Sequence, residues 1–105
     1  MDSKYELDGF FYPLKNGWTV YSKTGCKNCV MVKDILIKQN NLLVVNCDDF
    51  LNDEPTKKLF LKLIDNMSGK QPRTFPMVFY NNRFVGGYYE ALDLVELQME
   101  IDEDF

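Results

Sequence analysis

Two cysteines lie three positions apart in the segment Cys26-Lys27-Asn28-Cys29. This spacing lets one thiol attack a disulfide while the second thiol resolves the mixed disulfide that forms. An apolar run over 18–21 precedes the pair, and a helical pattern follows it. The cysteine pair therefore predicts thiol–disulfide exchange as the chemistry of this chain.

Cys26 is predicted to be the nucleophile of the pair. It stands where the predicted helix over 27–39 begins, and the positive end of a helix dipole stabilises a thiolate. Lys23 and Lys27 add positive charge nearby. We expect these charges to lower the pKa of Cys26 below the ordinary value of about 8.5. Cys29, one turn farther into the helix, is predicted to be more buried and to act as the resolving thiol.

The elements that would position these thiols alternate between strand and helix. Strand-like runs cover 18–22, 42–47, 77–80 and 83–86, and helical patterns cover 27–39, 54–67 and 90–99. The continuous apolar run at 42–47 is typical of a buried parallel strand. Asn81-Asn82 suits a tight hairpin between the last two strands. The order β-α-β-α-β-β-α predicts an α/β protein, with a mixed sheet and helices on both of its faces.

Length and composition limit what kind of protein this is. The 105 residues suffice for one domain with a modest core, and a hydrophobic content of 46% is that of a globular chain. The net charge of −4 provides no attraction for phosphate backbones, so no nucleic-acid partner is expected. No apolar run has the length of a membrane span, and no membrane association is expected. We divide the chain into an extension at 1–16, a main domain at 17–99 and an acidic tail at 100–105.

The three cysteines, Cys26, Cys29 and Cys47, cannot all pair within the chain, and the polar start over 1–6 shows no secretory leader. Both features favour a reducing compartment, and we expect a cytoplasmic monomer. Cys47 lies in an apolar strand and is predicted to be a small buried hydrophobic residue. A zinc site is the alternative interpretation of the cysteine pair. The chain has no histidine and only Cys47 remains, so no metal is expected.

Three separated motifs resemble the glutaredoxin family of the thioredoxin fold. The segment 20–29 resembles the family's first strand and active-site loop, Thr74-Phe75-Pro76 resembles its T-V-P element, and 86–90 resembles its glycine pair followed by an acidic residue. The motifs occur in the family's order, and the resemblance spans residues 18–97. It implies a thioredoxin fold with a four-stranded mixed sheet flanked by helices, and a cis peptide bond before the proline.

The resemblance also implies where glutathione would bind. Lys23 would hold the glycine carboxylate, and the backbone of Phe75 would pair with the cysteinyl residue. The amides of Tyr89 and Glu90, with the Glu90 side chain, would take the γ-glutamyl end, because a helix N-terminus suits a carboxylate. The full set of implied glutathione-binding residues is Lys23, Phe75, Pro76, Gly87, Tyr89 and Glu90.

Two departures from the family pattern concern this site. Lys27 and Asn28 stand where the family commonly has proline and tyrosine, which changes the stiffness and the surface of the active-site loop. The polar helix residue that often helps to bind the glycine carboxylate has no clear counterpart in this chain. Lys58, Lys62 and Arg73 are the candidates for binding the glycine carboxylate in its place, and the sequence does not choose among them.

The function implied by the resemblance is that of a dithiol glutaredoxin, which reduces protein disulfides and glutathione mixed disulfides with glutathione as reductant. Its partners would be glutathione and disulfide-containing proteins. A thioredoxin-like electron donor served by a flavoprotein reductase is one alternative, which Lys27 and Asn28 keep open. A second is a dimeric module that binds an iron–sulfur cluster between two Cys26 thiolates and two glutathiones. The family's cluster carriers typically have serine at the second position, so Cys29 argues against that module.

Overall fold

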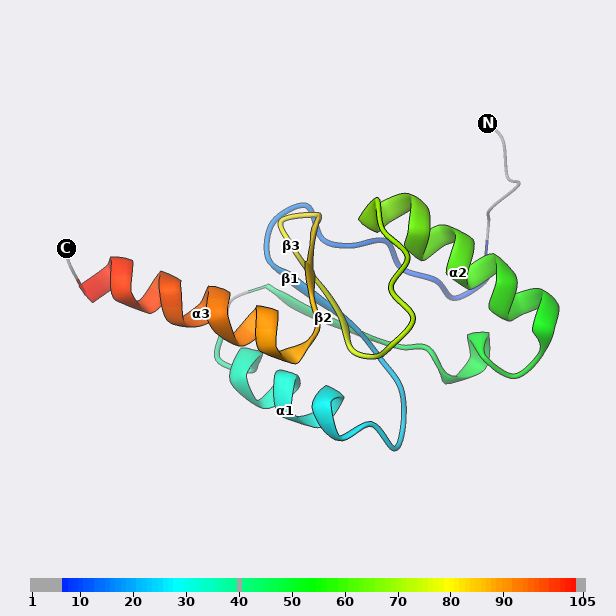
Figure 1. Ribbon diagram of the computed structural model, residues 1–105, viewed down its shortest axis with the longest axis horizontal. Coiled ribbons are helices and arrows are strands. Elements are labelled where there is room, and N and C mark those ends of the chain that lie inside the picture. Colours follow the sequence, from blue (N-terminus) through cyan, green and yellow to red (C-terminus); the bar gives the residue numbers. More distant parts are fainter. Residues whose placement is uncertain (1–6, 40, 104–105) are drawn as a thin grey trace.

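The structure is a computed structural model that describes residues 7–39 and 41–103 (Figure 1). Its elements follow the predicted order. Along the chain they are β1 (Trp18–Ser22), α1 (Lys27–Leu36), β2 (Leu42–Asn46), the short 3₁₀ helix η1 (Asp48–Phe50), α2 (Glu54–Ser68), β3 (Met77–Tyr80), β4 (Arg83–Gly86) and α3 (Tyr88–Glu103). Residues 1–6 of the predicted extension and 104–105 of the predicted tail lie outside the described ranges.

The four strands form one mixed sheet in the order β2-β1-β3-β4. β1 pairs with β2 in parallel and with β3 antiparallel, while β3 and β4 form the predicted hairpin. The turn residues Asn81 and Asn82 have φ angles of 51° and 66°, which asparagine tolerates better than most residues. Because β1 is a central and fully buried strand, the chain enters the cysteine loop from a rigid support.

Helices cover both faces of this sheet (Figure 1). α1 and α3 lie together on one face, and α2 lies on the other. Successive side chains of a strand point to opposite faces, so β1 contributes to a hydrophobic cluster on each side. Trp18 and Val20 belong to a cluster with Leu36 of α1, whereas Tyr21 belongs to one with Phe60 of α2. Packing on both sides therefore holds the end of β1, and with it the start of the cysteine loop.

The described part of the predicted extension, residues 7–16, runs along the α2 side of the sheet. The Phe10 ring stacks on Tyr21 with 5.5 Å between ring centroids, and it lies 6.2 Å from the Phe60 ring. The Tyr21 hydroxyl donates a hydrogen bond of 2.6 Å to the carbonyl oxygen of Phe11. Burial raises the pKa of Tyr21, so this hydroxyl stays protonated and remains a donor. Phe10 thus packs onto the hydrophobic core of the domain.

β2 differs in burial from the prediction made for the run at 42–47. It is parallel to β1 as expected, but it is the edge strand of the sheet. Only Val45 in it is buried, and Val44 is 40% exposed. The prediction of a buried strand is therefore wrong. An apolar run identifies a strand, but it does not say whether a second strand pairs with its other side.

Two helices end at positions other than those predicted. α1 stops at Leu36, and a turn over 37–39 follows it. α3 begins earlier than predicted and continues to Glu103, so most of the segment predicted as a solvated tail is helical. No glycine or proline follows Gly87 in the sequence, and therefore nothing in the chain breaks this helix early.

Candidate active site

Cys26 and Cys29 lie at the start of α1 and form a disulfide, with Cα atoms 5.2 Å apart. Cys26 is the N-cap residue of the helix, and its Sγ accepts the backbone N–H of Cys29 at 3.2 Å. After reduction, this N–H and the helix dipole both stabilise a thiolate. Cys26 is partly exposed, whereas Cys29 is completely buried, so the predicted difference in burial is confirmed. Of the pair, only Cys26 is open to a substrate sulfur.

Asp48 holds the loop that leads from β1 to the cysteines. Its carboxylate accepts hydrogen bonds from the Thr24 backbone N–H at 2.9 Å and from the Thr24 hydroxyl at 2.5 Å. These bonds, with a smaller contribution from the Lys23 charge, lower the pKa of Asp48. The preceding residue, Cys47, donates its N–H to the Ser22 carbonyl oxygen at 2.8 Å, which fixes η1 beside the end of β1. Asp48 has no predicted role, because nothing in the neighbouring sequence shows which loop it contacts.

Phe75 lies beside Cys26, and the peptide bond between Phe75 and Pro76 is cis, as the family resemblance implies. The Phe75 carbonyl oxygen is 3.7 Å from the Cys26 Sγ. The Phe75 ring stacks on Phe60 of α2 with 6.1 Å between centroids, and the Lys23 Nζ lies 5.6 Å from the centroid of the same ring. Packing against α2 therefore sets the Phe75 backbone next to the reactive sulfur.

α3 begins beside the same segment, with Gly87 as the residue that precedes its first turn. The Gly87 carbonyl oxygen accepts the N–H of Ala91 at 3.0 Å, and the Gly87 N–H donates to the Glu90 Oε1 at 2.8 Å. The first amides of a helix have no partner inside it, and an N-cap side chain usually satisfies one of them. Glycine has no such side chain, so Gly87 supplies no side-chain acceptor to the amides of Tyr89 and Glu90.

Two cavities meet at Phe75. The first, of about 220 Å³, lies where α3 begins, and the residues that line it include Asn28, Thr74, Phe75, Pro76, Gly87, Tyr89 and Glu90. The second, of about 320 Å³, is lined by Lys23, Leu51, Lys57, Arg73, Thr74 and Phe75. All six residues implied for glutathione are thus gathered around one segment. Cations stand at one end of this site and a helix N-terminus at the other.

Lys57 is a cation of the second cavity that the sequence analysis missed. Lys58 and Lys62, which were candidates for the glycine carboxylate, are not among the residues that line this cavity. Lys57 precedes Phe60 by three residues, so the two side chains share one side of α2. Because Phe60 stacks on Phe75, that side of the helix faces the site. The sequence shows the three lysines, but the packing of α2 decides which one reaches the cavity.

Arg73, the third of those candidates, does line the second cavity. Its guanidinium donates from Nη1 and Nη2 to the two carboxylate oxygens of Asp65, at 2.8 and 2.9 Å. This pair lowers the pKa of Asp65 and raises that of Arg73. Asp65 neutralises the charge of the guanidinium, so Lys23 and Lys57 provide the net positive charge of the cavity.

Cys47 takes no part in the site. Its side chain is completely buried, as predicted, and burial raises the pKa of this thiol to about 12, so it stays protonated near neutral pH. Within the described ranges, no group of three or more cysteine, aspartate or glutamate side chains could hold a metal ion. No helix in that part of the chain is both long and apolar enough to cross a membrane.

Gly86→Ala is expected to destabilise the fold at this site by about 1–3 kcal/mol. Gly86 has a φ angle of +136°, which other residues rarely adopt, and a Cβ atom there would lie 2.8 Å from the Glu90 side chain. Gly87→Ala is the matched control, because a Cβ at Gly87 makes only ordinary contacts of 3.5 Å or more. Thermal unfolding of both variants measures the difference. Equal losses in melting temperature would contradict the special role of Gly86.

The sequence model of the glutaredoxin family matches residues 18–85, from β1 into β4. No curated protein sequence gives a match. Among solved structures, glutaredoxin 1 from Francisella tularensis in complex with cacodylate has a TM-score of 0.62 and 17% identity, over 79% of this chain and 95% of that chain. This likeness confirms the thioredoxin fold predicted from the sequence.

Two further structures cover a similar part of the chain. Oxidised glutaredoxin 2 from Chlamydomonas reinhardtii has a TM-score of 0.57 and 26% identity, over 79% of this chain and 74% of that chain. The complex of buckwheat glutaredoxin with glutathione has a TM-score of 0.56 and 24% identity, over 74% and 66% of the two chains. Because the family match takes in the cysteine loop, the cis-proline segment and the last strands in one order, the chain belongs to the glutaredoxin family and is a thiol–disulfide oxidoreductase.

Proposed function

We propose that this protein is a glutathione-dependent oxidoreductase that reduces protein disulfides and glutathione mixed disulfides. One observation carries the proposal: Phe75 lines both cavities, and its carbonyl oxygen is 3.7 Å from the Cys26 Sγ. An elongated thiol ligand that follows Phe75 would have its sulfur at Cys26 and one end in each cavity. The buckwheat glutaredoxin of similar fold was solved in complex with glutathione, which supports the same ligand here.

Glutathione matches the charges at both ends of this site. Its glycine carboxylate would face Lys23 and Lys57 in the 320 Å³ cavity. Its γ-glutamyl end carries a carboxylate and an ammonium on one carbon. The amides of Tyr89 and Glu90 would take the carboxylate, and the Glu90 side chain would take the ammonium. The cysteinyl residue in the middle would pair with the backbone of Phe75.

Pro76 and Gly87 shape the passage between these two ends. Both line the 220 Å³ cavity, in which the γ-glutamyl link would lie. A Cβ atom at Gly87 would lie 3.7 Å from the Pro76 carbonyl oxygen and would narrow this passage. A glycine here therefore suits a ligand whose backbone passes close to the protein backbone.

In the proposed reaction, the reduced Cys26 thiolate attacks the glutathione sulfur of a mixed disulfide. A bond forms between Cys26 and glutathione, the original S–S bond breaks, and the protein sulfur leaves with the electron pair and takes up a proton. The thiolate of a second glutathione then attacks the glutathione sulfur held on Cys26. This step releases glutathione disulfide and regenerates the Cys26 thiolate, so one disulfide is exchanged for another.

Protein disulfides would follow a second route that uses Cys29. Attack by Cys26 leaves one substrate cysteine bound to the enzyme and frees the other as a thiol. Cys29, whose Cα is 5.2 Å from that of Cys26, then attacks the Cys26 sulfur, closes the enzyme disulfide and releases the reduced substrate. Two glutathione molecules reduce the enzyme again and leave as glutathione disulfide.

We also propose that the protein works as a monomer in the cytoplasm. One chain supplies both cavities and both thiols of the site. The third thiol, Cys47, is free and buried, which suits a reducing compartment. A native molecular mass of 12.3 kDa measured by light scattering would support the monomer, and twice that mass would contradict it.

The proposed function is tested by reduction of a small glutathione mixed disulfide with glutathione, coupled to glutathione reductase. We expect steady turnover in this assay and little turnover when a thioredoxin-type flavoprotein reductase supplies the electrons. The opposite preference would overturn the proposal in favour of the thioredoxin-like electron donor.

Lys23→Ala is expected to raise the apparent KM for glutathione mixed disulfides roughly tenfold, the effect of losing about 1.4 kcal/mol of binding. The rise in KM should be smaller for a small disulfide without carboxylates, because the Lys23 ammonium binds the glycine carboxylate of glutathione. Lys58→Ala is the matched control, since it removes the same charge from a residue that does not line the cavity. If Lys23→Ala raised the KM equally for both substrates, Lys23 would not bind the glycine carboxylate. Its role would then be limited to stabilising the Cys26 thiolate.

A further inference from the structure

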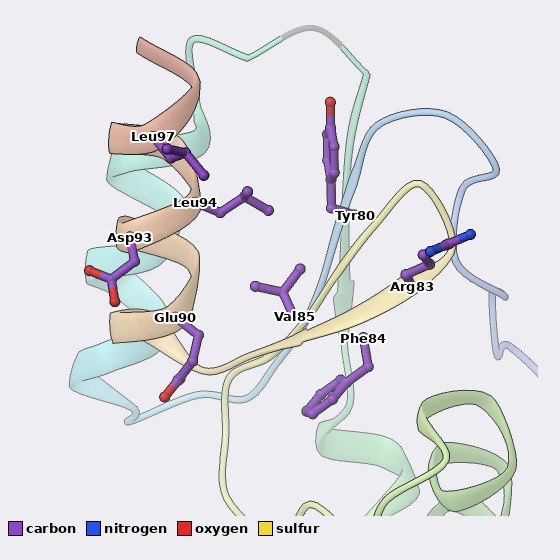
Figure 2. A pocket seen from close by; sticks show the side chains of 8 residues that line it. All are labelled: Tyr80, Arg83, Phe84, Val85, Glu90, Asp93, Leu94 and Leu97. Atoms are coloured by element: carbon purple, nitrogen blue, oxygen red, sulfur yellow. The ribbon is translucent and has the colours of Figure 1, made fainter. Parts of the chain in front are cut away.

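A third cavity, of about 540 Å³, lies between β4 and α3, beside the two cavities described above. Figure 2 shows Val85 and Leu94 pointing toward one another across it, with the Tyr80 ring beyond them. These three side chains pack against the buried cluster between the sheet and α1, so the floor of the cavity is apolar and held in place. Leu97, which is 52% exposed, extends this floor along α3. We call the cavity the β4–α3 groove.

The β4–α3 groove adjoins the redox site. Phe84 and Glu90 line both the groove and the 220 Å³ cavity beside Cys26. β4 is also the last strand of the sheet, so within the described ranges no strand pairs with its outer side. Beyond the smaller cavity, the groove is therefore the next hollow that a peptide would reach when its cysteine sulfur reacts at Cys26.

The α3 side of the groove is acidic. The helix carries no lysine or arginine, and its acidic residues are Glu90, Asp93, Glu96, Glu100, Asp102 and Glu103. Glu90 and Asp93 are the two that line the groove. Arg83 is the basic residue of the lining, and Figure 2 shows it at the hairpin end of β4, directed away from α3. The α3 rim thus complements a basic partner.

We propose that the β4–α3 groove binds an extended segment of the protein substrate, next to its reacting cysteine, that alternates apolar and basic side chains. The inference rests on the proposed function, because it assigns the protein part of the disulfide substrate to the same site. Neighbouring residues of an extended peptide point in opposite directions. One side chain of each pair would contact the floor of Val85 and Leu94, and the next would point out of the groove, where a long basic side chain can reach the Asp93 carboxylate on the outer side of α3.

The distances along α3 set the length of this segment. Glu90 and Leu97 are separated by seven positions, which is about 10 Å along a helix axis. An extended chain covers this length in about three residues. The recognised side chains should therefore lie within a few residues of the cysteine, beyond those that occupy the 220 Å³ cavity. Recognition of this length is sequence-specific without requiring a folded substrate.

Disulfide-linked peptide dimers test the proposal. Each peptide carries one cysteine and an arm of the sequence Ala-Ala-Leu-Lys-Leu-Lys, Ala-Ala-Leu-Glu-Leu-Glu or Ala-Ala-Ser-Lys-Ser-Lys, placed before or after the cysteine. We expect the Leu-Lys arm, in one of the two placements, to give a kcat/KM roughly tenfold above those of the other two arms. The Ser-Lys arm has the same charge as the Leu-Lys arm but no leucine. It therefore distinguishes recognition by the apolar groove from simple electrostatic attraction to an acidic protein.

Charge reversal on α3 tests whether the preference for the Leu-Lys arm arises at the β4–α3 groove. In Asp93→Lys, the ratio of kcat/KM between the Leu-Lys and Leu-Glu arms should fall to unity or invert. Glu96→Lys is the matched control, because it makes the same charge change on the same helix at an exposed residue that does not line the groove. It should leave the ratio close to that of the unmodified protein.

Two outcomes would overturn the proposal. The first is equal kcat/KM for all arms in both placements, and the second is an equal change of the ratio in Asp93→Lys and Glu96→Lys. Either result leaves the proposed function intact as long as the small glutathione mixed disulfide is still reduced. Failure to reduce that small substrate would instead reject the proposed function, so the two failures are distinguishable.

Discussion

Cys26→Ser is expected to lower turnover of every disulfide substrate to the uncatalysed rate. Cys26 is the partly exposed thiol at the start of α1, and the N–H of Cys29 points at its sulfur. No other thiol can replace it. Cys29 is completely buried behind it, and Cys47 is buried in the core with its pKa raised to about 12. Serine is a far weaker nucleophile at neutral pH because its hydroxyl stays protonated.

Initial rates with a glutathione mixed disulfide and with a protein disulfide measure this loss. Cys47→Ala is the control variant, since it removes a thiol that the site does not use, and it should keep the rates of the unmodified protein at a temperature where it is folded. Substantial activity in Cys26→Ser would show that Cys29 can act as the nucleophile, and the assignment of the two thiols would then fail.

Cys29→Ser is expected to separate the two substrate classes. Reduction of glutathione mixed disulfides should continue, because a second glutathione can attack the sulfur held on Cys26. Reduction of protein disulfides should fall to a small fraction, because no second enzyme thiol is present to release the bound substrate. Cys29 is buried, and its Cα is 5.2 Å from that of Cys26. This position suits the resolving step and does not suit the first attack on a substrate disulfide.

The ratio of the two activities in one preparation of Cys29→Ser gives the measurement. A change in concentration or folding of the variant lowers both activities alike and leaves the ratio unchanged. If both activities fell together relative to an independently measured folded fraction, Cys29 would be needed for the first attack, and the two-step scheme would be wrong.

The sequence predicts those parts of the site that depend on short segments. The strand and the glycine-containing loop that precede Cys26 predict that it lies at a helix start, and the structure confirms it as the N-cap residue. The hairpin at Asn81-Asn82 is confirmed for the same reason. Both features are set by residues that are neighbours along the chain, whereas the cis bond before Pro76, which is also confirmed, is implied by the family resemblance.

The parts that the sequence does not predict depend on contacts between distant segments. Asp48 reaches Thr24 across 24 positions, and no local pattern indicates this pairing. Lys57 faces the site because the ring of Phe60 stacks on Phe75, which fixes the rotation of α2. The exposed edge of β2 follows in the same way, because no other strand in residues 7–39 and 41–103 pairs with its outer side. The domain boundaries at 16 and 99 remain predictions.

The central claim, that Cys26 carries glutathione during the reaction, is tested most directly by trapping. The Cys29→Ser variant is incubated with glutathione disulfide, and the modified residue is located by mass spectrometry under non-reducing conditions. The account predicts one glutathione per chain, attached to Cys26 and released by added glutathione, with Cys47 unmodified. A folded variant that forms no adduct, or one that carries glutathione on Cys47 while Cys26 stays free, would contradict it.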